Sequence, residues 1–147
     1  MDTHQEQVPA KLPGVTITIP GKPFAWRRAR SNGKFRFKDK ATDANRDTLA
    51  AIVSRHFNAA TEGPVRLTVR AVFKVPASWP KKKQAAHLWR PHTSKPDLGN
   101  IVKEIEDGLN RIAWVDDSQI AEYGPCAKVW GDRDYTVLVI ERIGGVV

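Results

Sequence analysis

Acidic side chains recur at intervals between residues 97 and 117, with one lysine among them. Asp97 opens this stretch, Asp107 follows, and an adjacent pair, Asp116 and Asp117, closes it, while Lys103 lies between the first two. Carboxylate oxygens are the ligands that hard divalent cations prefer, and such cations bridge protein oxygens to phosphate oxygens. The spacing therefore predicts a metal-assisted centre that acts on phosphate groups.

Residues 97–112 have the periodicity of an amphipathic helix. At about 100° per residue, one stripe collects the apolar side chains Leu98, Ile101, Val102, Ile105, Leu109 and Ile112. Asn100, Lys103 and Asp107 then share the opposite face, spaced three and four residues apart. That face is too polar for a core. Together these features fit phosphodiester hydrolysis, in which a cation activates water and Lys103 neutralises the phosphate or leaving oxygen.

Each of these residues also has a purely structural explanation, and the sequence leaves those alternatives open. Asp97 follows a proline and opens the helix, where it could accept a backbone hydrogen bond as an N-cap. Asp116 and Asp117 could form an ordinary turn, and Lys103 with Asp107 could be a surface ion pair. Against the turn, two adjacent carboxylates beside apolar residues repel each other unless a cation or lysine compensates.

The chain as a whole is strongly basic. Its 147 residues contain 24 Lys and Arg against 16 Asp and Glu, which gives a net charge of +8 at pH 7. This excess is typical of proteins that bind nucleic acid or an anionic surface, and a solvated basic surface is the alternative. The predicted nucleic-acid contacts form two clusters on irregular segments: Arg27, Arg28, Arg30, Lys34, Arg36 and Lys38, then Lys81, Lys82 and Lys83.

The sequence lacks the residues that several other kinds of functional site require. The single cysteine, Cys126, excludes an intramolecular disulfide framework and a multi-cysteine zinc site, and the four histidines lack zinc spacing. There is no P-loop and no serine-nucleophile motif. His92 is expected to face a loop surface or nucleic acid. Trp79 and Trp89 flank the lysines 81–83, where a ring could stack on an exposed base instead of joining the core.

The predicted fold is one α+β domain, a small mixed sheet packed with two main helices. We expect residues 1–13 to form a disordered tail and residues 14–147 to form the domain. The chain has no apolar run of membrane-spanning length and no signal-peptide core at its start. The expectation is therefore a cytoplasmic protein with no membrane partner.

Alternation and helical periodicity place the elements of this domain. Strands are predicted at 15–19, 65–73, 126–130 and 135–141, and helices at 42–60 and 97–112. Residues 76–96 are predicted to form a long basic connection with one short helix around 82–89.

Several of these segments resemble one family. The motifs are KPDLGNIVK at 95–103, DGLN at 107–110 and WVDDSQI at 114–120. They resemble the RusA family of Holliday-junction resolvases, which is common in prophages. The segments PGKPFAWRRAR at 20–30 and SWPKKK at 78–83 are similar to this family as well. The resemblance covers nearly all of residues 15–141.

The resemblance implies a homodimeric endonuclease that makes paired nicks in four-way DNA junctions with Mg²⁺ or Mn²⁺. It implies these roles by position: metal ligands Asp97 and Asp117 with Asp116 as an auxiliary carboxylate, catalytic lysine Lys103, and supporting residues Asn100 and Asp107. One departure is Gly99, which occupies the position of a family aspartate and offers no side-chain ligand. This copy is therefore either inactive or weak, or it carries a substitution selected or introduced because the active nuclease harms its host.

Three functions remain open on the sequence alone. The first is a RusA-like junction endonuclease, impaired or intact, and the second is a protein that binds branched DNA without hydrolysis. The third is an RNA-binding or structural prophage protein, which would keep the charge but has no use for Asp97, Lys103 and Asp117 together.

Overall fold

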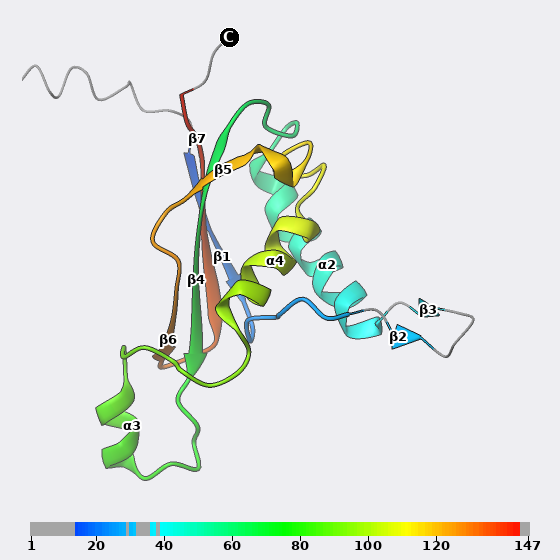
Figure 1. Cartoon of the computed structure of the whole chain (residues 1–147). Coiled ribbons are helices and arrows are strands. Elements are labelled where there is room, and N and C mark those ends of the chain that lie inside the picture. The colour runs from blue at the N-terminus through cyan, green and yellow to red at the C-terminus, as the bar shows by residue number, and fades with distance from the viewer. Residues whose placement is uncertain (1–13, 29, 32–35, 38, 145–147) are drawn as a thin grey trace, which may run out of the picture.

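A five-stranded mixed sheet forms the centre of the structure (Figure 1). The computed structural model describes residues 14–28, 30–31, 36–37 and 39–144. The strands of the sheet are β1 (Gly14–Pro20), β4 (Val65–Lys74), β5 (Ile120–Tyr123), β6 (Ala127–Gly131) and β7 (Tyr135–Arg142). β7 lies between β1 and β4 and pairs antiparallel with both. β5 and β6 pair parallel with successive parts of β4.

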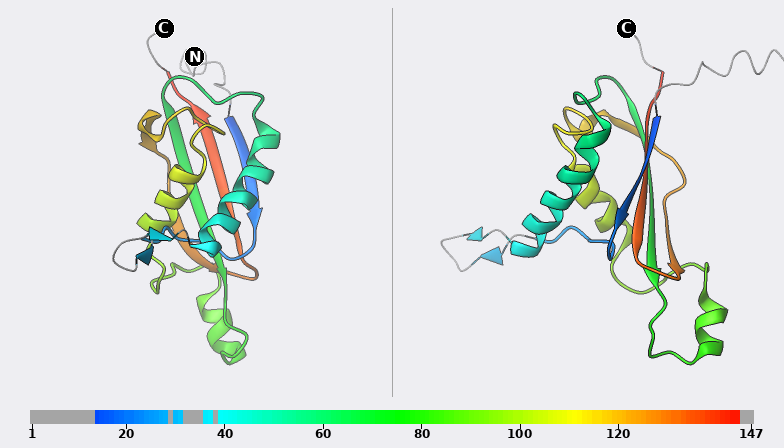
Figure 2. Two further views of the ribbon diagram at one scale, coloured as in Figure 1. Left: turned by 90° about the vertical axis from the view of Figure 1, so that its right-hand side faces the viewer. Right: turned by 180° about the vertical axis from the view of Figure 1, so that it is seen from behind.

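Two helices, α2 (Lys40–Val53) and α4 (Leu98–Gly108), cover one face of this sheet (Figure 2). The alternation predicted for the strands produces the buried face: Ile17 and Ile19 of β1 and Leu138 and Ile140 of β7 point into the core. The stripe predicted for α4 supplies the opposing surface. The predicted architecture, a single mixed α and β domain with two main helices, is therefore confirmed.

An ion pair inside the helix layer fixes how α4 sits. Glu104 is fully buried, and its carboxylate accepts hydrogen bonds from Arg46 at 2.9 and 3.0 Å and from Asn45 at 2.9 Å. A Cβ on Gly108 would lie 2.9 Å from Leu49 Cδ1, so the end of α4 approaches α2 closely. Breaking a buried pair of this kind costs about 3–5 kcal/mol. The pair therefore holds α4 in the rotation that turns Lys103 outward.

Element boundaries differ from the predictions where long-range contacts intervene. α2 gives way to the short 3₁₀ helix η1 (Ser54–His56), because the Thr61 N–H donates to Ala113 O at 2.9 Å and draws the chain towards Trp114. α4 likewise ends at Gly108, four residues before the predicted end. The expected short helix is α3 (Lys81–His87). The predicted tail, residues 1–13, lies outside the described residues.

Two projections extend beyond the sheet and its helices (Figures 1 and 2). One is the pair of short strands β2 (Arg30–Ser31) and β3 (Arg36–Phe37), which precedes α2 and pairs antiparallel. The other carries α3 and lies beyond the end of β4. Arg30 and Arg36 of the first predicted basic cluster therefore lie on one projection, and the second cluster, Lys81, Lys82 and Lys83, lies on the other. None of the helices that the structure describes has the length and apolar character needed to cross a membrane.

Candidate active site

Lys103, Asp107 and Asp117 come together on the outer side of α4. Lys103 is exposed and Asp107, one turn later, is partly buried. Asp117 begins the 3₁₀ helix η2 (Asp117–Gln119). Burial raises the pKa of the Asp107 carboxyl, the Lys103 charge opposes that rise, and a hydrogen bond with Asp117 adds to it. Asp107 and Asp117, ten positions apart in the chain, thus form an acidic pair beside Lys103.

Asn110 links Asp117 to the core. The Asn110 amide donates to Asp117 Oδ2 at 3.5 Å, and its Oδ1 accepts from Trp114 Nε1 at 3.1 Å. Trp114 is completely buried. The sequence analysis assigned no role to Asn110, although it falls in the segment 107–110 that carries the family resemblance. The structure shows that this amide connects the buried indole to the candidate site.

A capping box holds the loop that carries Asp117. The Asp116 carboxylate accepts the Ser118 N–H at 3.0 Å, and hydrogen bonds from Ser118 lower the pKa of Asp116. Gln119 Oε1 accepts the N–H of Asp116 at 2.9 Å, and its amide donates to Thr61 O at 2.8 Å. The sequence signal was the D-x-x-Q spacing, which is typical of a capping box. Asp116 thus has a structural task, and its role as an auxiliary ligand stays a prediction.

Trp26 lies against Lys103, which the sequence did not indicate. The Lys103 ammonium is 4.6 Å from the centre of the Trp26 ring, a cation–π contact. The Trp26 N–H also donates to Asn100 O at 2.8 Å. Trp26 immediately precedes Arg27 and Arg28, so the first basic segment begins at the side of α4 that presents Lys103. The ring restricts where the ammonium group can lie.

Asp97 occupies the other end of α4. Its backbone is extended, and its exposed carboxylate makes no capping hydrogen bond with the described residues. Lys128 holds the preceding loop, because its ammonium donates to Ser94 O and, at 2.7 Å, to Pro96 O. Ten residues of helix separate Asp97 from Asp107, which is about 15 Å at 1.5 Å per residue. Asp97 therefore lies at the opposite end of α4 from Asp107.

Gly99 lies on the exposed surface between these two acidic ends. A Cβ added to Gly99 would meet nothing within 4 Å, and position 99 is one helical turn from Lys103. Within the described ranges, no three or more His, Cys, Asp or Glu side chains converge on one point. The donors fit a hard divalent cation in kind, since they are carboxylates, but they are few at any one place.

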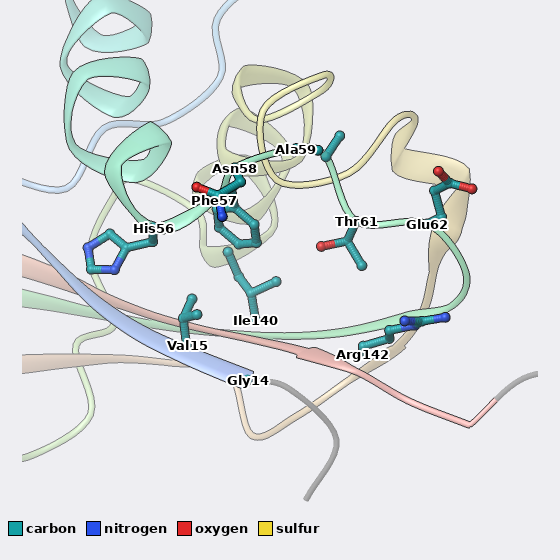
Figure 3. A pocket seen from close by; sticks show the side chains of 11 residues that line it. Gly14, Val15, His56, Phe57, Asn58, Ala59, Thr61, Glu62, Ile140 and Arg142 are labelled. Carbon is teal, nitrogen blue, oxygen red and sulfur yellow. The ribbon is translucent and has the colours of Figure 1, made fainter.

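The hollow shown in Figure 3 lies away from these residues. It has a volume of about 560 Å³ and is lined by the end of η1, the following loop and strands β1 and β7 (Figure 3). His56, Glu62 and Arg142 are its charged or titratable side chains, and neither Lys103 nor the acidic pair lines it. The candidate site is instead an open helix face, which suits a polymer better than an enclosed small molecule.

The predicted nucleic-acid contacts are only partly visible. Arg27 and Arg28 are exposed, and Arg27 pairs with Asp39 at 3.0 Å. Lys34 and Lys38 lie outside the described residues, as do the side chains of Arg30 and Arg36. All three lysines of the second cluster, Lys81, Lys82 and Lys83, are exposed on α3.

His92 does not face solvent or nucleic acid, contrary to the sequence prediction. It is 6% exposed and lies between Phe73 and Trp130, with ring centres at 4.4 and 4.0 Å. Burial, with the nearby Lys128 charge, lowers the pKa of His92. His92 is buried because its backbone N–H donates a hydrogen bond to Lys128 O, which attaches this loop residue to β6.

Comparison with known proteins gives the family of this chain. The family described as Endodeoxyribonuclease RusA matches residues 20–141, a span that includes α4, the Asp117 loop and the first basic segment. The match therefore puts the molecule in a class of proteins described as DNA endonucleases. It belongs to the RusA endodeoxyribonuclease family, as the motifs indicated. Among curated proteins it is similar to the uncharacterized protein YqaN of Bacillus subtilis (strain 168), with 35% identity over 139 residues, covering 88% of this chain and 96% of the relative.

Proposed function

We propose that this protein is a structure-selective endodeoxyribonuclease that resolves four-way DNA junctions by paired, metal-dependent hydrolysis. The observation that carries the proposal is the grouping of Lys103 with Asp107 and Asp117 on an open face of α4, in a chain of this family. The test is cleavage of a labelled four-way junction beside plain duplex, with and without divalent cation.

In this proposal Asp97 and Asp117 would hold Mg²⁺ or Mn²⁺, with Asp116 as an auxiliary carboxylate. Mg²⁺ often takes only one or two protein carboxylates and fills its shell with water and substrate phosphates, which suits a site with few ligands. When bound, the cation supplies Lewis acidity at the phosphate.

The chain's own groups perform the remaining steps. The Lys103 ammonium, restricted by the Trp26 ring, neutralises charge that develops on the phosphate or the leaving oxygen. Asp107 lies beside Asp117, which helps to raise the pKa of the Asp107 carboxyl, and Asn110 ties Asp117 to buried Trp114. Asn100 supports the same face, because its backbone carbonyl accepts a hydrogen bond from the Trp26 backbone N–H.

A second candidate is a protein that binds junctions or branched DNA without cutting them. Gly99 favours this candidate, because the basic projections do not depend on the metal site. The two candidates differ in cleavage and agree in binding. A junction-binding assay in EDTA followed by addition of Mg²⁺ or Mn²⁺ separates them.

We expect a homodimer in solution. A four-way junction has approximate two-fold symmetry, and its resolution requires two opposed nicks, so one site per subunit about a two-fold axis matches the substrate. Light scattering at micromolar protein should give about twice the monomer mass of 16.4 kDa. A monomer mass across that range, with or without junction DNA, contradicts this expectation.

Neutralising the first basic cluster is expected to weaken DNA binding and its salt dependence. Arg28 is exposed and makes no ion pair within the part of the chain that the structure describes, so it is free to contact phosphate. Arg28→Gln should lower junction affinity and reduce the slope of log affinity against log salt by about 1. The combined change of Arg27, Arg28 and Arg30 should do so more strongly. Fluorescence anisotropy at several salt concentrations measures both quantities.

Arg55→Gln is the matched control for Arg28→Gln. Arg55 is also exposed, but it lies beyond the far end of α2, about 20 Å along the helix from the segment that carries Arg28. If Arg28→Gln and Arg55→Gln lower junction affinity by the same factor, binding depends on net charge only. An unchanged affinity after the triple change removes these arginines from the DNA-binding surface.

A further inference from the structure

Trp89 is an exposed tryptophan held in an unfavourable backbone conformation. Its surface is 47% exposed, and its φ is 64°, in the left-handed region. A bulky residue at positive φ is rare, and such strain persists only where the surroundings enforce it, often at functional sites. The buried core of the described residues does not include Trp89. Something other than core packing must therefore account for its position.

The neighbouring strand enforces this position. The Trp89 N–H donates to Trp130 O at 2.8 Å, and the Trp130 N–H donates to Arg90 O at 3.0 Å. The ring itself lies against Gly131, where an added Cβ would be 3.0 Å from Cζ3 and 3.2 Å from Cη2. A buried glycine thus leaves room for the indole against β6, and the rest of the ring stays in solvent.

Trp79 shows by contrast what an anchoring tryptophan does in the same projection. Its ring packs against Trp130 and His87, with centres at 5.1 and 4.8 Å, and the Lys83 ammonium lies 4.2 Å from its centre. Trp79 therefore attaches α3 to the sheet and stacks with groups of this chain. Trp89, two residues beyond α3, has no such aromatic partner within the described structure and keeps a free surface.

The basic residues around Trp89 indicate what kind of partner it could bind. Arg90 is exposed beside it, and α3 presents Lys81, Lys82 and Lys83 to solvent. Basic side chains that follow a phosphate backbone, combined with an aromatic platform, are the usual means of binding unpaired bases. The projection also lies at the end of the sheet where α4 begins with Asp97 (Figure 1).

We propose that Trp89 stacks on an unpaired or unstacked base of the DNA and so favours branched over fully paired DNA. This inference rests on the proposed function and adds to it the residue that would contact the bases at the branch point. In a continuous duplex every base is already stacked, so the indole gains nothing there. At a branch point a base can leave its neighbours at small cost and lie on the rigid ring.

The test uses the full chain and a four-way junction with 2-aminopurine at the branch point, in EDTA so that no cleavage occurs. Trp89→Gly removes the ring and suits a positive φ, so the backbone is not strained further. It should lower junction affinity about tenfold or more and abolish the change in 2-aminopurine fluorescence, while duplex affinity stays at the parent level. Trp89→Phe, which keeps an aromatic face, should retain most of both signals.

Lys82→Gln is the control, since it removes a phosphate contact without touching the ring. It should weaken junction and duplex binding by the same factor and reduce the salt slope. Two outcomes overturn the inference: Trp89→Gly with parental junction affinity and fluorescence, or equal losses on junction and duplex. If the parent protein binds no DNA, the proposed function itself is overturned. If the parent binds junctions and Trp89→Gly binds them with the same affinity, only this inference is overturned.

Discussion

Lys103→Ala is expected to reduce junction cleavage by about 10²–10³-fold while junction binding in EDTA changes little. The lysine acts on charge that develops in the transition state, so its loss affects rate more than affinity. The residue is exposed and lies off the core stripe of α4, so its removal leaves no cavity. The cation–π contact with Trp26 and the attraction to Asp107 are lost, and the free energy of unfolding should fall by no more than about 1 kcal/mol. Single-turnover cleavage, anisotropy and thermal unfolding measure the three quantities.

Lys74→Ala is the control for this prediction. Lys74 is also exposed and carries the same charge, but it ends β4 and does not contact α4's acidic pair. The Lys74→Ala variant should cleave the junction at nearly the parental rate. Normal cleavage by Lys103→Ala, or its failure to fold, would show that the outer face of α4 has been misinterpreted.

Gly99→Asp is expected to have the opposite effect, raising cleavage by about a hundredfold or more. The new side chain enters open space, one turn from Lys103 and between the two acidic ends of α4. It adds an oxygen ligand where the described residues supply too few at one place. Stability should change little or rise by up to about 1 kcal/mol, because glycine is a poor helix former and an acidic residue suits the first helical turn.

Metal affinity gives a readout of Gly99→Asp that does not depend on cleavage. Calorimetric titration with Mn²⁺ in the absence of DNA should show tighter binding than in the parent chain. Gly99→Asn, which has nearly the same shape without the charge, should stay close to the parent in both assays. If Gly99→Asp leaves metal affinity and cleavage unchanged, position 99 is not a lost ligand, and the metal site inferred from the family resemblance does not apply to this chain.

Local patterns were sufficient to predict most of the fold and the outward face of α4. Strict alternation at 15–19 and 65–73 corresponds to β1 and β4, and the apolar stripe of 97–112 corresponds to the buried side of α4. These features depend on neighbouring residues only. The presence of Lys103 and Asp107 on one exposed side follows from the same geometry.

Features that depend on distant partners could not be predicted in this way. Glu104 is buried because Arg46, 58 positions earlier, supplies two hydrogen bonds, and no helical pattern reports such a partner. The contact of Trp26 with Lys103 depends on the path of the chain between β1 and β2. The place of Asp117 beside Asp107 depends on which turn of α4 the η2 loop meets. The motif indicated the residues but not their distances.

The most direct measurement is cleavage of an end-labelled four-way junction by the parent chain and by Gly99→Asp, with Mg²⁺, with Mn²⁺ and in EDTA, beside a duplex of the same arm sequence. We predict paired nicks at symmetric positions in the junction with either cation, no nicks in EDTA or in the duplex, and faster cleavage by Gly99→Asp than by the parent. No nicking by either protein, or equal nicking of junction and duplex, would contradict the assignment as a junction resolvase.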